Sequence, residues 1–176
     1  IVEGMGFTLC DDYGQMWAYD DNDAVRNTSE SIFEVTWTRD NGNWIWMMYH
    51  RNYYDPNNSY TWIKWITPSR DLIAAYAAEG DTERANACIT YDQTGTDPNS
   101  AWSNYYPADN YAFMHKCPTN ASSTILMRLG EIYLLHAEAL CMTGDLAGAA
   151  TYVNKIRERA GLKAVATPSS QEAAIE

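Results

Sequence analysis

Residues 124–162 carry the pattern that most constrains how this chain of 176 residues can fold. Apolar side chains recur at helical spacing over 124–142, and a second helical pattern follows the turn Thr143-Gly144-Asp145. Gly144 tolerates a left-handed backbone, Asp145 can cap the second helix, and Gly161 can close it. Two helices joined by so short a turn pack antiparallel, so the sequence predicts an αα-hairpin.

The apolar positions define the face that each predicted helix buries. They are Ile125, Leu129, Ile132, Leu135, Ala139 and Leu140 in the first helix, and Leu146, Ala149, Ala150, Val153 and Ile156 in the second. Ala137, Gly144 and Ala149 also have the spacing of a tetratricopeptide repeat, in which close helix approach needs small side chains. One hairpin cannot bury its face alone, so we expect neighbouring repeats outside this sequence or packing of residues 1–120 against it.

The rest of the chain has few regular patterns. The run from Ser31 to Trp37 is rich in β-branched and aromatic residues and predicts a strand. Pro68 is expected in the first turn of a helix that has Leu72, Ile73 and Tyr76 on its apolar face and ends at Gly80. Glycines and prolines within 86–120 leave room only for short strands there.

These patterns together predict a mainly α fold, in which a helical hairpin supports long aromatic-rich loops and a few short strands. We divide the chain, as one fragment over 1–176, into an aromatic-rich loop and strand segment (1–66), a helix with an irregular segment (67–120), the hairpin (121–162) and the start of a next helix (163–176). Both ends resemble cuts in a longer chain.

Charge and hydropathy exclude several classes of partner. The net charge is −11, and the few lysines and arginines are scattered, so neither a nucleic acid nor anionic lipid is an expected partner. No run of about eighteen apolar residues exists that would span a bilayer.

The four cysteines have no CxxC spacing, so zinc is not expected. Cys141 lies in the first predicted helix and should be a small buried hydrophobe. Cys88 and Cys117 lie in less regular sequence, where an oxidising compartment would allow a disulfide bond between them.

Aromatic residues with a polar group are unusually frequent, with seven Trp and thirteen Tyr against three Phe. Sugar sites combine flat apolar rings with carboxylates, amides and guanidinium groups, and the stretch 37–65 supplies all of these. The stacking candidates are Trp44, Trp46, Tyr53, Tyr54, Trp62 and Trp65, with Arg51, Asp55, Asn57 and Asn58 as polar partners. The alternative is that Trp44 and Trp46, two residues apart, share one face of a strand and cover the core.

Other polar clusters favour structural roles. The run Asp20-Asp21-Asn22-Asp23 has oxygen ligands for Ca²⁺ but lacks the glycine and distal glutamate of an EF-hand loop, so a solvated turn is favoured and no cofactor is expected. Arg128, Glu131, Glu138, Arg157 and Arg159 are interpreted as a structural set of salt bridges.

A catalytic function has little support in the sequence. Glu131 and Glu138 lie two helical turns apart, with no cleft implied, which argues against a glycoside hydrolase. His50, His115 and His136 are isolated from one another and from any nucleophile motif. We therefore do not expect an enzyme.

The hairpin sequence resembles the signature of the RagB/SusD family. The resemblance rests on the run from Arg128 to Leu140, which contains Arg128-Leu129-Gly130-Glu131 and Ala137-Glu138-Ala139, on Gly144-Asp145, and on the run from Asn154 to Leu162, which contains Arg157, Arg159 and Gly161. Weaker similarity lies upstream at Glu30–Val35 and at Pro68–Ile73 followed by Asp81 and Arg84. The resemblance as a whole spans residues 30–162 and corresponds to the C-terminal part of the family region.

The resemblance implies a SusD-like fold and a non-catalytic role in nutrient uptake. The intact protein would be a lipoprotein on the cell surface, anchored by lipid in the outer membrane outside this chain, that binds an oligosaccharide for a SusC-like TonB-dependent transporter in polysaccharide utilisation. Cys10 does not match the lipid-bearing cysteine. The structural residues that carry over are Arg128, Glu131, Ala137, Glu138, Gly144, Ala149, Asn154, Arg157, Arg159 and Gly161. The alternatives are a helical-repeat module that binds protein and, third, a polysaccharide-acting enzyme.

Overall fold

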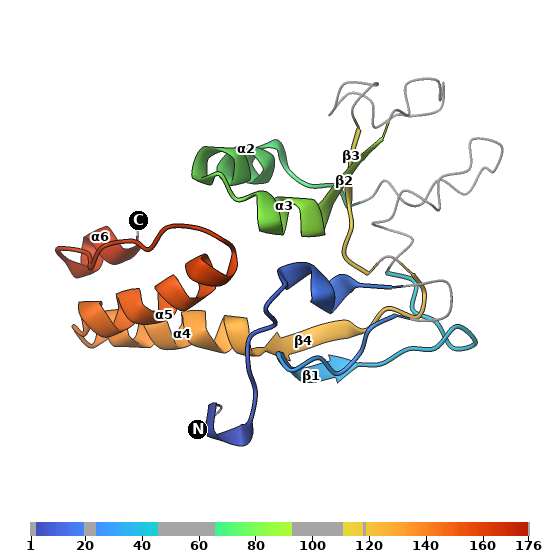
Figure 1. Cartoon of the computed structure of the whole chain (residues 1–176), viewed down its shortest axis with the longest axis horizontal. Helices are drawn as coiled ribbons and strands as arrows, with labels where there is room; N and C mark the ends of the chain where they lie inside the picture. Colours follow the sequence, from blue (N-terminus) through green and yellow to red (C-terminus); the bar gives the residue numbers. More distant parts are fainter. Residues whose placement is uncertain (1–2, 20–23, 46–65, 93–110, 118, 176) are drawn as a thin grey trace. The chain divides into compact units, whose positions relative to one another are not determined.

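The computed structural model describes residues 3–19, 24–45, 66–92, 111–117 and 119–175 (Figure 1). The chain divides into two compact units, the first made of Ile1–Tyr13, Asn27–Val35 and Ile125–Glu176, and the second of Gly14–Arg26 and Thr36–Thr124. Among the described residues the fold is mainly helical with a few short strands, which confirms the predicted class. Within that part of the chain, none of the helices has the length and apolar character needed to cross a membrane.

The first unit contains the predicted αα-hairpin. Helices α4 (Leu129–Met142) and α5 (Leu146–Arg159) lie antiparallel, side by side, in Figure 1. Gly144 joins them with a φ of 90°, and the N–H groups of Gly144 and Asp145 donate to carbonyls of the last turn of α4. Asp145 then caps α5, because its Oδ1 accepts from the Gly148 N–H at 2.9 Å. After α5, Gly161 closes the helix with a φ of 71°.

Two apolar clusters hold the hairpin. The first is Leu129, Tyr133 and Ile156, with Phe7, Leu9, Ile32 and Tyr152 packed against it. The second is Ala137, Cys141 and Ala149, with Leu140, Leu146, Tyr152 and Val153 around it. The small residues Ala137 and Ala149 are therefore buried at one helix contact, which confirms the tetratricopeptide-like spacing.

The buried face of α4 differs from the predicted one. Leu135 is 54% exposed and Ala139 is also exposed, while the helix buries Gly130, Tyr133 and Cys141 in addition to Leu129 and Ala137. Since α4 is apolar around most of its circumference, periodicity could not identify the side that packs. The predicted buried face of α5 agrees better with the structure, because Ala149, Ala150 and Ile156 are buried.

The prediction of helix over 124–142 was wrong for its first five residues. Thr124–Arg128 form strand β4, which pairs with β1 (Ser31–Val35) in a two-stranded antiparallel sheet (Figure 1). The pairing continues into the helix, since the Leu129 N–H donates to the Glu30 carbonyl at 2.9 Å. Pairing with β1, about ninety residues earlier in the sequence, thus determines that 124–128 are extended. The local sequence pattern does not reveal this distant partner.

Three short helices lie near the two ends of the chain. They are the 3₁₀ helices η1 (Glu3–Met5) and η2 (Tyr13–Trp17) near the start and the α-helix α6 (Gln171–Ile175) at the other end. Helix α6 lies in the segment 163–176 where the sequence predicts the start of a next helix.

The second unit contains the predicted helix near residue 70. Helix α2 (Arg70–Glu79) is capped by Ser69, so Pro68 lies before the cap and not in the first turn. Gly80 ends α2 with a φ of 68°, as predicted. None of the residues of α2 is buried, so the apolar face predicted for Leu72, Ile73 and Tyr76 does not form a core.

A short helix that the sequence analysis missed follows at once. Helix α3 (Thr82–Cys88) is capped by Asp81, whose buried carboxylate accepts from the Arg84 N–H at 3.1 Å and pairs with the Arg84 guanidinium. The chain continues into β2 (Ile89–Asp92), which pairs antiparallel with β3 (Tyr111–Met114). These strands match the short strands expected within 86–120.

All four cysteines are described, all are buried, and none is in a disulfide bond. The Cys88–Cys117 bridge that the sequence allowed is therefore not formed. Burial raises the pKa of the Cys117 thiol to about 11. Cys141 is the small buried hydrophobe that the sequence predicts.

Candidate functional site

Most of the predicted sugar-binding residues lie outside the described residues. These are Trp46, Arg51, Tyr53, Tyr54, Asp55, Asn57, Asn58, Trp62 and Trp65, and the same holds for the acidic run at 20–23. Trp44 is described, and its side chain is 72% exposed. The alternative that Trp44 covers the core is therefore wrong.

Trp44 stands on a turn that hydrogen bonds hold in place. Asn43, just before it, is buried, and its N–H donates to the Asn120 carbonyl at 2.9 Å while its Nδ2 donates to the Ser122 carbonyl at 2.6 Å. The Asn43 Oδ1 also accepts from the Ile45 N–H at 3.0 Å. The backbone is thus fixed on both sides of the exposed indole.

The approach to this turn is also close-packed. A Cβ added at Gly42 would lie 2.6 Å from the Asn120 Nδ2, so glycine allows the two segments to meet. The Asn120 Nδ2 in turn donates to the Arg39 carbonyl at 3.1 Å. Residues 39–45 are therefore tied to residues 120–122, and the indole is presented without a need for backbone ordering on binding.

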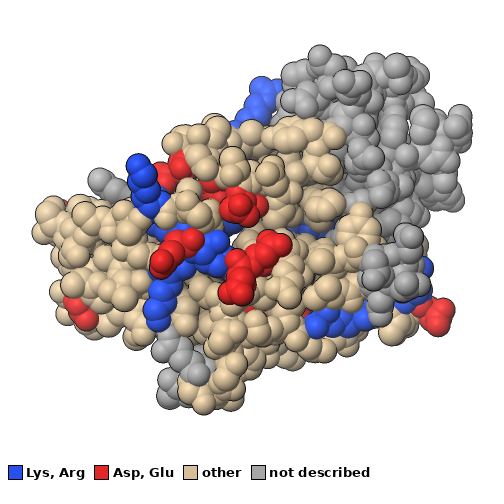
Figure 2. Space-filling model, viewed as in Figure 1, with Lys and Arg blue, Asp and Glu red and all other residues tan. Residues whose placement is uncertain are grey.

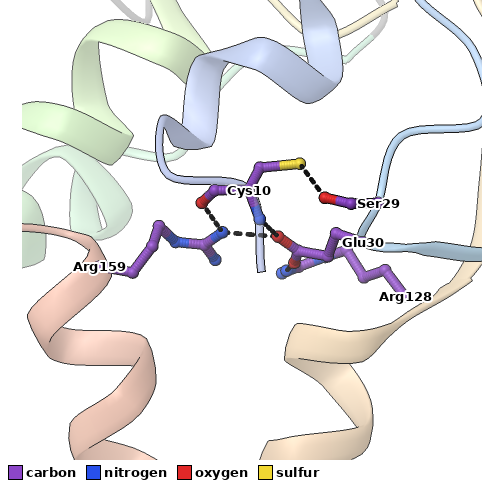
Figure 3. A network of polar contacts seen from close by, with 5 residues as sticks. All are labelled: Cys10, Ser29, Glu30, Arg128 and Arg159. Atoms are coloured by element: carbon purple, nitrogen blue, oxygen red, sulfur yellow. Dashed lines mark hydrogen bonds and ion pairs between the residues drawn. The ribbon is translucent and has the colours of Figure 1, made fainter. Parts of the chain in front are cut away.

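In the first unit, a buried carboxylate gathers four segments (Figure 3). Glu30 is 0% exposed; its Oε1 accepts from Arg128 Nη1 at 2.6 Å and its Oε2 from Arg159 Nη1 at 2.6 Å. The Cys10 N–H donates to the same Oε2 at 3.1 Å, and Arg159 also donates to the Cys10 carbonyl at 3.4 Å. We call Glu30, Arg128 and Arg159 the carboxylate hub.

Burial by itself would raise the pKa of Glu30, but the hydrogen bond and charge of Arg159, the Cys10 N–H and Arg128 outweigh it and lower the pKa. The Tyr13 ring lies near both guanidinium groups, with its centroid 5.0 Å from the Arg159 Cζ and 5.7 Å from that of Arg128. Glu30 therefore stays ionised and shielded from solvent. Such a group joins structural elements and is not placed for proton transfer to a substrate.

The predicted salt-bridge set is only partly brought together. Arg128 and Arg159 share Glu30, whereas Glu131 and Glu138 are exposed. Arg128 lies in extended backbone just before α4, so the helical i,i+3 relation to Glu131 does not apply. Sequence reasoning missed the role of Glu30 because it lies 98 residues from Arg128.

Two polar residues near the end of α5 also have structural contacts. Arg157 Nε donates to the Lys163 carbonyl at 2.9 Å. Asn154 both donates to the Val165 carbonyl, at 3.0 Å, and accepts from its N–H, at 2.8 Å. Together they fold the segment after α5 back along the helix.

Basic and acidic side chains are interspersed on the face of the described residues that Figure 2 draws. Both basic and acidic side chains also line an open cavity of about 650 Å³ in the first unit. Its wall includes Phe7, Asp11, Tyr133, Lys155, Glu158 and Arg159. In the described part of the chain, no group of three or more His, Cys, Asp or Glu side chains could hold a metal ion.

Comparison with known proteins gives a consistent family signal. The model of the SusD family matches residues 91–176. A SusD superfamily protein from Bacteroides vulgatus has a similar structure, with a TM-score of 0.65 and 19% identity over 99% of this chain and 41% of that one. A SusD-like protein from Bacteroides fragilis aligns with a TM-score of 0.59 and 20% identity over 97% of this chain and 43% of that one.

At this identity the structural likeness establishes a shared fold. The chain spans about two fifths of the length of these two solved structures. No match was found among curated proteins.

Proposed function

We propose that this chain is part of a non-catalytic glycan-binding protein of the SusD family, because the SusD family model matches residues 91–176 and the fold resembles that of SusD-like structures. The observation that carries the proposal is the exposed indole of Trp44 on its fixed turn. A flat ring of this kind can stack on the C–H face of a pyranose.

The remaining members of the proposed site are Trp46, Arg51, Tyr53, Tyr54, Asp55, Asn57 and Trp62. They supply rings and hydrogen-bonding groups close to Trp44 in sequence. The intact protein would act at the cell surface, attached to the outer membrane by a lipid outside this chain, and pass the oligosaccharide to a SusC-like TonB-dependent transporter. Family membership supports both the ligand class and this partner.

A second candidate function is protein binding by the helical hairpin. Helix α4 exposes Leu134, Leu135 and Met142, at 43%, 54% and 62%. Exposed apolar residues clustered on one helix favour contact with another polypeptide. This reading is compatible with glycan capture if the polypeptide is the transporter or another part of the same protein.

Calorimetric titration of Trp44 variants of the full chain with an oligosaccharide panel tests the proposal. Trp44→Ala should weaken binding of the best oligosaccharide about tenfold, since an aromatic contact contributes about 1.5 kcal/mol. Trp44→Phe keeps a ring and should retain most of the affinity.

The matched control is Phe33→Ala. Phe33 is an aromatic side chain in β1 that is 58% exposed, but it belongs to the other unit. Its removal should leave the affinity unchanged. Equal loss in Phe33→Ala and Trp44→Ala, or no loss in Trp44→Ala, would contradict a sugar platform at Trp44.

A further inference from the structure

The cavity in the first unit contains a buried hydrogen-bonding group that the carboxylate hub does not use. Arg159 has a side chain that is 5% exposed and directs Nη1 to Glu30 and to the Cys10 carbonyl. Among the described residues, its Nε and Nη2 have no hydrogen-bond partner. Buried donors of a guanidinium group are costly to leave unpaired.

These two nitrogens have a specific geometry. Nε and Nη2 form one edge of the planar guanidinium, and their parallel N–H groups match the two oxygens of a carboxylate. Nη1, on the other side, already holds Glu30. The hub therefore keeps its internal ion pair while Arg159 retains an edge for a second carboxylate.

Basic side chains in the cavity wall favour an anion. Arg159 contributes one positively charged group to this wall. Lys155 adds another in the cavity wall, where its Nζ lies 4.7 Å from the Tyr133 ring centroid. Asp11 and Glu158 also line the cavity but are exposed, so solvent screens their charge more than that of the hub.

The rest of the wall suits a sugar ring. Phe7 and Tyr133 provide apolar surface, and the carboxylates of Asp11 and Glu158 can accept hydrogen bonds from hydroxyl groups. A volume of about 650 Å³ is ample for one or two sugar units. The wall thus pairs basic donors for one end of a ligand with acidic acceptors for its hydroxyls.

We propose that this cavity binds a uronate unit of an acidic glycan, with the sugar carboxylate on the Nε–Nη2 edge of Arg159 and beside Lys155. The inference rests on the proposed function for the ligand class but places a second site in the other unit from Trp44. Because Nε and Nη2 are buried, binding requires the cavity wall to adjust so that the ligand reaches them.

The test uses methyl glucuronide and methyl glucoside, which differ by the carboxylate at C6, with acetate as a third probe. Each is titrated into the full chain while NMR follows the Nε–Hε resonance of Arg159. Methyl glucuronide should move this resonance in a saturable way, and methyl glucoside and acetate should each bind about tenfold more weakly. An equal response to acetate, an equal response to methyl glucoside, or no response to methyl glucuronide would overturn the proposal.

Two variants and one control variant make the result specific. Arg159→Lys removes the paired edge and should abolish the preference for the uronate. Lys155→Met leaves the carboxylate hub intact and should weaken methyl glucuronide binding several-fold, whereas Lys163→Met, at an exposed lysine outside the cavity wall, should not. An unchanged affinity in Lys155→Met would argue against the site.

Failure here can be told apart from failure of the proposed function. The Trp44 variants report on neutral oligosaccharide binding in the second unit, and the Arg159 resonance reports on the cavity alone. Loss of uronate binding with an intact Trp44 effect would remove only the second site.

Discussion

At the residue scale, Glu30 joins separate segments of the first unit. It is fully buried and accepts hydrogen bonds from Arg128, Arg159 and the Cys10 N–H, so removing its charge takes away the carboxylate that the two guanidinium groups share. The sequence allowed prediction of Arg128 and Arg159 as salt-bridge residues, but not of their partner. A contact between residues 98 apart is set by the fold and has no local pattern.

Replacing Glu30 with Gln should destabilise the protein by about 3–5 kcal/mol, because one member of a buried ion-pair network is lost. Urea denaturation measures the change in the free energy of unfolding. Glu131→Gln, at an exposed glutamate, is the control and should change it by no more than about 0.5 kcal/mol. Similar small effects for both variants would contradict the role assigned to Glu30.

The contribution of Glu30 should also depend on pH. Its pKa in the folded protein lies below the ordinary value of 4.5, so the folded state favours the ionised form more than the unfolded state does. The stabilisation is therefore fully present above pH 4.5 and is lost as the pH falls through the lowered pKa. The difference in unfolding free energy between wild type and Glu30→Gln should shrink over that range, and a constant difference would contradict this linkage.

Gly130 should resist substitution although it lies in a helix. Alanine normally stabilises a helix interior by about 1 kcal/mol relative to glycine. At Gly130, however, a Cβ would lie 2.8 Å from Glu30 Oε1 and would also clash with the Arg128 guanidinium. Gly130→Ala should therefore lower the melting temperature, while Gly4→Ala, where no atom lies within 4 Å, should not. A higher melting temperature for Gly130→Ala would show that the side chains of the carboxylate hub can move to accommodate the added methyl group.

At the element scale, helix ends marked by a glycine were predictable, and elements defined by distant contacts were not. Gly80, Gly144 and Gly161 end helices as predicted because each adopts a positive φ that other residues disfavour. The change from β4 to α4 at Leu129 was not predictable, since β4 forms through its pairing with β1. The described member of the candidate sugar site, Trp44, was proposed from composition, but the hydrogen bonds of Asn43 that hold its turn could not be predicted.

Asp145 provides a test of the hairpin at this scale. Asp145→Ala removes the hydrogen bond to the Gly148 N–H and should destabilise the protein by about 1 kcal/mol. Asp145→Asn keeps a capping oxygen and should lie close to wild type. Thermal denaturation followed by circular dichroism distinguishes them, and equal loss in both variants would point to the charge of Asp145 instead of the cap.

At the scale of the whole molecule, the chain combines two kinds of structure. A hairpin joined through Glu30 gives the first unit its core, and the second unit presents Trp44 on a turn fixed by Asn43. The fold class followed from the helical patterns of 124–162, and the resemblance to the SusD family rested on residues 128–140, 144–145 and 154–162, within the range that the family model matches. The sugar that would bind could not be predicted, because rings and amides suit many glycans alike.

The central claim is that this protein captures a glycan and does not change it. The most direct measurement is titration of the full chain with a panel of oligosaccharides, followed by tryptophan fluorescence, with product analysis after long incubation. We expect saturable quenching by at least one oligosaccharide and no new product. Absence of a response to every glycan would favour a protein-binding scaffold, and formation of a shorter sugar would show an enzyme; either result would contradict the claim.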